Sequence, residues 1–242
     1  MKKICILEND DLAPEITPVY KGYAAMFVRL FQDAGAADWQ FDVFYTPAQQ
    51  YPASFDAYDA VVLTGSKADS FSDEPWVVEL RRRVSGLLDQ KKKLLGICFG
   101  HQLIALCMGA KVGRAPQGWG VGRMAYAWQI DSMPSAPDNK QMALLVSHQD
   151  QVLELPRDAT LLASNAHCPV AAYAVGEQVF CVQGHPEFVE DYSAFLMGKR
   201  RERLGEELYT RGVDSLQQGH DGLDVARMMI AFVEGDSVRR AA

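Results

Sequence analysis

The stretch Leu94-Leu95-Gly96-Ile97-Cys98-Phe99-Gly100-His101-Gln102 decides the fold of this chain. Two apolar residues lead into a Gly-x-Cys-x-Gly pattern, and an apolar segment with helical spacing follows it. This order is typical of a nucleophile elbow, in which a buried strand turns sharply into a helix and exposes one side chain. Glycines flank the turn because strand and helix approach too closely there for a Cβ atom. The stretch therefore predicts a strand, a tight turn at Cys98 and a helix.

Cys98 is predicted to be a nucleophile. In the predicted turn it lies beside the amino terminus of a helix, where the positive end of the helix dipole favours the thiolate. The alternative is a buried structural cysteine, which is the usual state of a lone cysteine. The apolar strand before Cys98 and the apolar helix after it favour the nucleophile.

A second motif, Cys181-Val182-Gln183-Gly184-His185-Pro186-Glu187, follows an apolar strand. His185 lies at the expected strand end, where active-site groups gather in open α/β sheets. Glu187, two positions on, can fix the tautomer of the imidazole and stabilise its cation. Glu187 alone would be interpreted as a carboxylate at a helix start. Taken with the elbow, the motif predicts a Cys98–His185–Glu187 triad.

The apolar pattern predicts an α/β fold. Strand-like and helix-like segments alternate in the first half of the chain, and continuous apolar strands in such an alternation indicate a parallel sheet covered on both faces. Expected strands are 4–7, 41–45, 60–64, 94–98, 121–130, 142–146, 170–174 and 178–182. Expected helices are 19–31, 75–88, one after the elbow, 192–208 and 223–233. We expect one three-layer domain over residues 1–242, with a mostly parallel central sheet and with 133–138 as a surface loop.

Composition narrows the classes of function. The net charge of −7 gives no support for binding nucleic acid or an anionic membrane surface. No apolar run approaches the length of a membrane span or a signal-peptide core. The five cysteines form no CxxC pair, so a reducing cytoplasm is expected. The histidines lack metal-ligand spacing, and we expect no metal.

The two motifs together resemble the class I (triad) glutamine amidotransferase family, in its order and at its typical separation. Leu63-Thr64-Gly65-Ser66 lies where the family places its oxyanion loop. Ser147-His148-Gln149-Asp150 lies where the family has a Ser-His segment lining the glutamine pocket. The resemblance extends over most of the chain and implies a flavodoxin-like sheet with no metal or other cofactor.

The resemblance implies a role for each triad residue. Cys98 would attack the side-chain amide of glutamine, or a γ-glutamyl amide bond, and form a γ-glutamyl thioester. His185 would pass a proton to the departing ammonia or amine and then activate water. Glu187 would orient His185.

The resemblance also implies the substrate-binding residues. Backbone N–H groups of Phe99 and of Gly65 or its neighbour Ser66 would bind the oxyanion. Gln102 would contact the glutamyl group, and Ser147 and His148 would line its pocket. The substrate would be glutamine or a small γ-glutamyl compound.

Two departures from the family pattern bear on the function. Many members have Gly-Gly-Pro in the oxyanion loop, where this chain has Thr64-Gly65-Ser66, and a long acidic segment, 67–76, follows. This variant resembles the stand-alone subgroup that includes γ-glutamyl peptidases, and also the glutaminase domain of GMP synthase. Asp69, Asp73 and Glu74 in this segment are expected to be solvated at a loop and helix start. Trp119, between two glycines, is a candidate aromatic lid over the pocket, but ordinary packing is the favoured interpretation.

Several functions remain open on the sequence. The chain would be a free-standing γ-glutamyl hydrolase, or a glutaminase that delivers ammonia to a separate synthetase. A catalytically silent regulatory or binding module on the same fold is the alternative from another class, and the intact triad argues against it. A different cysteine enzyme with an elbow is disfavoured because such relatives lack the Gly-His-Pro-Glu turn.

Overall fold

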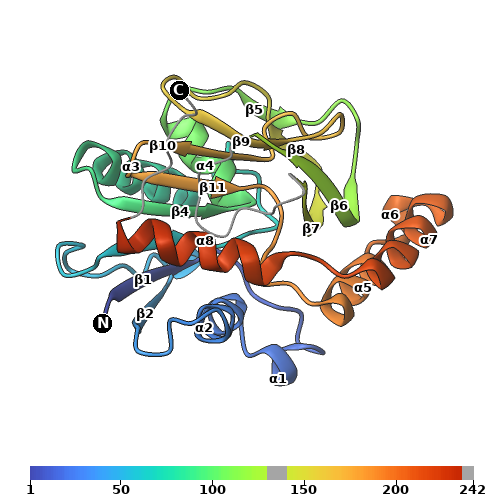
Figure 1. The fold of residues 1–242 in the computed structure, drawn as a ribbon, viewed down its shortest axis with the longest axis horizontal. Helices are drawn as coiled ribbons and strands as arrows, with labels where there is room; N and C mark the ends of the chain where they lie inside the picture. Colours follow the sequence, from blue (N-terminus) through green and yellow to red (C-terminus); the bar gives the residue numbers. More distant parts are fainter. Residues whose placement is uncertain (130–140, 236–242) are drawn as a thin grey trace.

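The computed structural model describes residues 1–129 and 141–235, and its middle layer is one large sheet (Figure 1). Within those residues the strand order is β2-β1-β3-β4-β11-β10-β9-β6-β7. Its strands are β1 (Lys3–Glu8), β2 (Gln40–Tyr45), β3 (Ala60–Leu63), β4 (Lys93–Ile97), β6 (Gly120–Trp128), β7 (Gln141–His148), β9 (Thr160–Ser164), β10 (Ala172–Val175) and β11 (Val179–Val182). A separate small sheet pairs β5 (Val112–Arg114) with β8 (Asp150–Val152).

The sheet has a parallel and an antiparallel part. Strands β2, β1, β3, β4 and β11 run parallel to one another. The pairings from β11 through β10, β9 and β6 to β7 are antiparallel. The α/β class and the parallel sheet around the elbow are confirmed. The strand β9 is an addition that the sequence analysis did not identify.

Helices cover both faces of the parallel part. On β1, Ile4 and Ile6 face one side of the sheet, and Cys5 and Leu7 face the other, as the two-residue period of a strand requires. Helices α2 (Tyr23–Asp33) and α8 (Gly222–Glu234) pack on the first face, and α3 (Pro75–Asp89) and α4 (Phe99–Cys107) on the second. Because both faces are buried, the strands are apolar throughout. The predicted three layers are confirmed.

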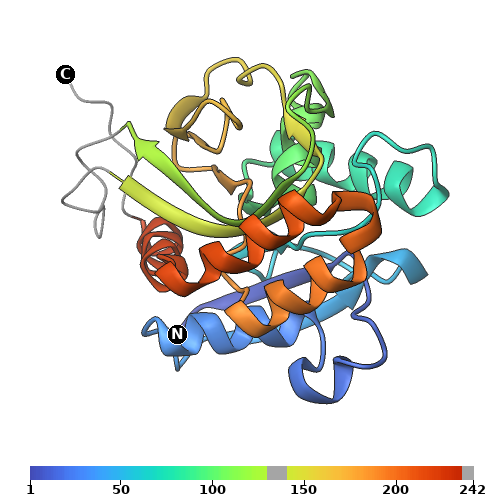
Figure 2. The same cartoon turned by 90° about the vertical axis from the view of Figure 1, so that its right-hand side faces the viewer.

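A group of three further helices, α5 (Glu190–Lys199), α6 (Arg201–Leu204) and α7 (Glu206–Ser215), lies at one end of the molecule (Figure 1). Figure 2, seen from that end, shows these helices lying across the strands β6 and β7. The expectation of a single helix over 192–208 is wrong. Gly205 has φ 76°, a left-handed conformation that ends α6 and begins α7.

The expectation of one helix over 19–31 is also wrong, because the chain breaks between α1 (Thr17–Tyr20) and α2. Lys21 has φ 68° at the break. The Glu8 carboxylate accepts a hydrogen bond of 2.9 Å from the Ala24 N–H in the first turn of α2. A carboxylate at a helix amino terminus favours a new start at that point.

Two short 3₁₀ helices, η1 (Thr46–Ala48) and η2 (Leu216–Gln218), complete the described elements. The loop expected at 133–138, and the last residue of the strand expected at 121–130, lie outside the described residues. No helix in the described ranges has the length and apolar character needed to cross a membrane.

The contact between α4 and β3 is too close for any side chain at Gly100. A Cβ atom placed there would lie 2.4 Å from the carbonyl oxygen of Leu63 and 2.6 Å from the Leu63 Cβ atom. A Cβ atom at Gly96 would lie 2.7 Å from the sulfur of Cys181. Both glycines of the elbow are therefore required by packing, as their place in the sequence predicted.

The substitution Gly100→Ala should lower the free energy of unfolding by about 1–3 kcal/mol, because the added methyl group must push α4 away from β3. Urea unfolding followed by circular dichroism measures this change. The matched control is Gly86→Ala in α3, where a Cβ atom would meet nothing within 4 Å. The control should instead raise stability by about 0.5–1 kcal/mol. Equal stability of Gly100→Ala and the unsubstituted protein would contradict this account of the packing.

Candidate active site

Cys98 occupies the sharp turn that the sequence predicts, between β4 and α4. Its backbone has φ 50° and ψ −100°, outside the usual regions for a side chain other than glycine. Such a conformation costs about 1–3 kcal/mol and persists only where the surrounding structure enforces it. Two backbone hydrogen bonds of 3.0 Å enforce it: the Cys98 N–H donates to Val182, and the Gln102 N–H donates to the Cys98 carbonyl.

His185 and Glu187 follow β11 and are both buried. The His185 N–H donates to the Leu145 carbonyl at 2.8 Å, which ties this turn to β7. Nδ1 of His185 lies 2.7 Å from Oε1 of Glu187, as an imidazole and its orienting carboxylate would. The ring of Phe188 stacks on the imidazole, with 3.8 Å between centroids.

Neighbouring groups set the charge of His185. Burial lowers the pKa of His185, but the negative charge of Glu187 and the charge and hydrogen bond of Cys98 outweigh burial and raise the pKa from 6.5 to about 10. The imidazole is therefore cationic at neutral pH. A cationic histidine beside a cysteine is the arrangement that activates thiol nucleophiles.

Gly65 brings a third segment to the same point. A Cβ atom placed at Gly65 would lie 2.7 Å from Cε1 of His185 and 3.7 Å from the Cβ atom of Cys98. Only glycine fits at position 65, because any side chain there would collide with the imidazole of His185. The backbone after β3 therefore approaches Cys98 as an oxyanion-binding loop would approach a nucleophile.

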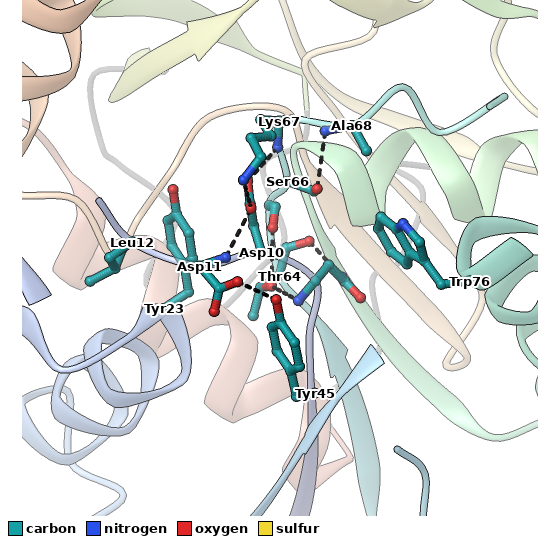
Figure 3. Close-up of polar contacts among 12 residues, drawn as sticks. Asp10, Asp11, Leu12, Tyr23, Tyr45, Thr64, Ser66, Lys67, Ala68 and Trp76 are labelled. Carbon is teal, nitrogen blue, oxygen red and sulfur yellow. Dashed lines mark hydrogen bonds and ion pairs between the residues drawn. The ribbon is translucent and has the colours of Figure 1, made fainter. Parts of the chain in front are cut away.

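Polar residues after β1 hold this loop in place (Figure 3). The Asn9 N–H donates to the Thr64 hydroxyl, and the Asn9 side-chain amide donates to the Thr64 carbonyl, both at 2.9 Å. Lys67 donates to the Asp10 carboxylate from its backbone N–H and from its ammonium group, both at 2.7 Å. The Ser66 hydroxyl accepts from the Ala68 N–H at 3.1 Å, which tightens the turn. Asn9 and Asp10 were not among the predicted site residues, although the sequence shows this polar pair directly after a buried strand.

Gln102 is connected to Cys98 through Gln183, which was not among the predicted site residues. The side-chain N–H₂ group of Gln102 donates to the Asp150 carbonyl at 2.8 Å and to Oε1 of Gln183 at 3.2 Å. The Gln183 amide in turn donates to the sulfur of Cys98 at 3.5 Å. Gln183 lies inside the quoted His185 motif, so its position was the available signal.

A small cavity of about 60 Å³ opens beside Cys98. Of the predicted substrate-binding residues, Ser66, Gln102, Ser147 and His148 line it, and Gly65 and Phe99 do not. Phe99 is buried with its ring 5.6 Å from that of Trp76, so only its backbone N–H is in a position to act. That N–H belongs to the first turn of α4, whose N–H groups have no partner within the helix.

His148 and His185 share one site but differ in charge. Burial, and then the neighbouring His167 and His185, lower the pKa of His148 from 6.5 to about 3. His148 is therefore a neutral wall of the cavity at physiological pH.

Three charged residues form one edge of this cavity: Asp69, Arg114 and Asp150. Arg114 donates to Asp150 at 2.8 Å and to Asp69 at 3.2 Å. Burial and a hydrogen bond with Asp69 raise the pKa of Asp150 to about 6, against the lowering effect of Arg114. The expectation that Asp69 is simply solvated is therefore wrong. The Arg114 guanidinium can bind the carboxylate of an amino-acid substrate, and the carboxylates of Asp69 and Asp150 can bind its ammonium group.

The cavity is closed on another side by Trp119 and Arg200. The guanidinium of Arg200 lies 5.4 Å from the centroid of the Trp119 ring and donates to the hydroxyl of Ser147. Trp119 thus contributes to the site, whereas the sequence analysis favoured ordinary packing. No group of three or more His, Cys, Asp or Glu side chains that could hold a metal occurs in the described part of the chain.

Comparison with known proteins gives consistent matches. The family model glutamine amidotransferase class-I matches residues 19–193. Gamma-glutamyl peptidase 3 of Arabidopsis thaliana is 39% identical over 188 residues, 72% of each chain. A glutamine-hydrolysing GMP synthase of Syntrophomonas wolfei is 33% identical over 130 residues, which are 53% of this chain and 24% of the synthase. The crystal structure of a glutamine amidotransferase from Thermotoga maritima has a TM-score of 0.77 at 18% identity, over 97% of this chain and 99% of that one, which shows the shared fold.

The substitution Glu187→Gln should lower the pKa of His185, because it removes the main charge that opposes burial. A pH titration of the imidazole Cε1–H signal by NMR measures this pKa. The matched control is Glu177→Gln, at an exposed carboxylate between β10 and β11. A histidine whose pKa is unchanged in Glu187→Gln would contradict the electrostatic account.

The same pKa shift predicts how stability depends on pH. Folding raises the pKa of His185, so its contribution to stability is fully present below about 6.5 and is lost as pH rises towards about 10. Urea unfolding between pH 6.5 and 10 should show this loss in the unsubstituted protein. Glu187→Gln should show less of it over the same range.

Proposed function

Because the chain belongs to the class I glutamine amidotransferase family, we propose that it hydrolyses γ-glutamyl amide bonds through a thioester on Cys98. The single observation that carries this proposal is the meeting of three segments around the thiol. His185 lies 2.7 Å from Glu187, and the neighbouring Cys98 helps to raise its pKa. Gly65 leaves room only for backbone between the imidazole and Cys98.

The acylation step follows from this geometry. The sulfur of Cys98 attacks the γ-carbonyl carbon of the substrate, and the carbonyl oxygen takes up negative charge. Backbone N–H groups of Phe99 and of the Gly65–Ser66 loop bind this oxyanion, and each such donor contributes about 3 kcal/mol to transition-state stabilisation. The cationic His185 gives its proton to the leaving nitrogen as the C–N bond breaks.

Deacylation uses the same groups. His185, now neutral, takes a proton from water, whose oxygen attacks the thioester carbon. The C–S bond breaks, glutamate leaves, and the proton on His185 restores the cation beside Cys98. Glu187 holds the imidazole in position in both steps and stabilises its charge.

Two variants of this function differ in the leaving group. A free-standing γ-glutamyl peptidase is supported by the 39% identity to an enzyme of that name. A glutaminase that supplies ammonia to a separate synthetase is supported by the likeness to GMP synthase, over 24% of its length. We favour the peptidase, and we expect the purified protein to hydrolyse γ-glutamyl peptides unaided. A protein slow on its own, and accelerated by a synthetase, would favour the second variant.

We place the enzyme in the cytoplasm. All five cysteines are free, and one of them is the proposed nucleophile. Free thiols persist in a reducing compartment.

Cys98 should be the site of covalent labelling by a diazo-ketone analogue of glutamine, because that electrophile reaches the thiol through the substrate pocket. Mass spectrometry of the digested protein should find one adduct, and Cys98→Ala should lose both labelling and hydrolysis. The matched control is Cys107→Ala, at a partly buried cysteine whose pKa burial raises. The control should label and hydrolyse normally. An adduct on another residue, or turnover by Cys98→Ala, would disprove the assignment.

A further inference from the structure

A wide groove adjoins the small cavity beside Cys98. It has a volume of about 1010 Å³ and lies between the segment 10–21 and helix α5. Lys67 and Arg200 line both the groove and the cavity, so the two spaces are neighbours. In the hydrolysis of glutamine the leaving group is only ammonia, which has no use for a space of this size.

The groove lies on the side of the imidazole. Tyr23 and Tyr192 form part of its wall and pack on Phe188, with ring centroids 6.5 Å and 4.7 Å from it. Phe188 in turn stacks on His185. Because His185 must protonate the leaving nitrogen, the leaving part of a substrate must extend towards this side of the site.

The groove is basic, although the chain as a whole carries a net charge of −7. Its charged lining residues are the basic Lys21, Lys67, Lys199 and Arg200 and the acidic Asp10 and Asp11. This excess of basic over acidic side chains favours an anionic ligand in the groove. The remaining wall is largely apolar, with side chains such as Leu12 and Phe195, and suits the side chain of a peptide.

Arg200 is the cation best placed to bind that anion. Lys67 is paired with Asp10, as Figure 3 shows, and Lys199 is paired with Glu15. Arg200 instead donates to the uncharged hydroxyl of Ser147, and no carboxylate in residues 1–129 and 141–235 lies within 4.0 Å of it. A guanidinium without a carboxylate partner, at the junction of the groove and the catalytic cavity, can bind a substrate carboxylate with two hydrogen bonds.

We propose that the groove binds the leaving portion of a γ-glutamyl peptide and that Arg200 recognises its terminal carboxylate. This inference rests on the function proposed above and makes it narrower. The preferred substrates are γ-glutamyl peptides whose released part has an apolar side chain and a free carboxylate. Glutamine and γ-glutamyl amides without that charge are poorer substrates.

The test compares γ-glutamyl-leucyl-glycine with its carboxy-terminal amide, which differ only in the charge at the end of the leaving group. The unsubstituted protein should have a kcat/KM about tenfold or more higher for the free acid, since hydrogen bonds to charged groups contribute about 1.5–3 kcal/mol. Arg200→Gln should reduce this ratio towards one. The matched control is Arg203→Gln, at an exposed arginine of α6 that lines neither the groove nor the cavity, and it should keep the ratio.

The outcomes separate this inference from the proposed function. Equal kcat/KM values for acid and amide in the unsubstituted protein would overturn the role of the groove and leave the hydrolase intact. An equal loss for both substrates in Arg200→Gln would show that Arg200 binds the shared γ-glutamyl part, and would overturn its role. Failure to hydrolyse either peptide or glutamine would overturn the proposed function, and this inference with it. If Arg200→Gln does not fold, Arg200→Lys should show a reduced ratio, because lysine lacks the planar fork.

Discussion

The turn at Cys98 is the constraint on which the rest of the structure depends. Its positive φ is unfavourable by about 1–3 kcal/mol. The residues around it offset this cost, because Ile97, Phe99 and Leu103 are almost fully buried, and each buried apolar side chain contributes about 1.5–3 kcal/mol. The elbow is therefore stable only as part of the packed sheet, with glycines at the two positions where α4 and the sheet meet.

Strand order then brings the chemistry together. Strands β3, β4 and β11 are parallel neighbours, with Leu63 opposite Gly96 and Val182 opposite Ile97. Parallel strands in register end at one edge of the sheet, so the segments that follow them must meet there. Those three segments are the 64–66 loop, the turn at Cys98 and the His185 turn. The order of the strands brings these segments close together, and the side-chain contacts then fix their exact positions.

The sequence could predict what depends on local pattern. Continuous apolar strands predicted the parallel sheet, and two short motifs predicted the segments that meet around Cys98. Contacts between residues that are far apart in the chain have no local sequence pattern from which they could be predicted. The Glu8 carboxylate that starts α2 comes from another element, and so does the Arg200 guanidinium that reaches Ser147. Trp119 and Asp69 were misjudged for the same reason: their neighbours in space, Arg200 and Arg114, are far away in the chain.

Two histidines show how neighbours, more than burial, determine chemistry in this site. His148 and His185 are each only 4% exposed, yet their pKa values move in opposite directions, to about 3 and about 10. Burial opposes the cation in both, and only His185 has a carboxylate in contact. Glu187 therefore keeps His185 cationic at neutral pH, whereas His148 is neutral. Under the proposed function, a substrate in this site meets a single imidazolium, and that imidazolium lies on the side of the groove, where the leaving nitrogen would receive its proton.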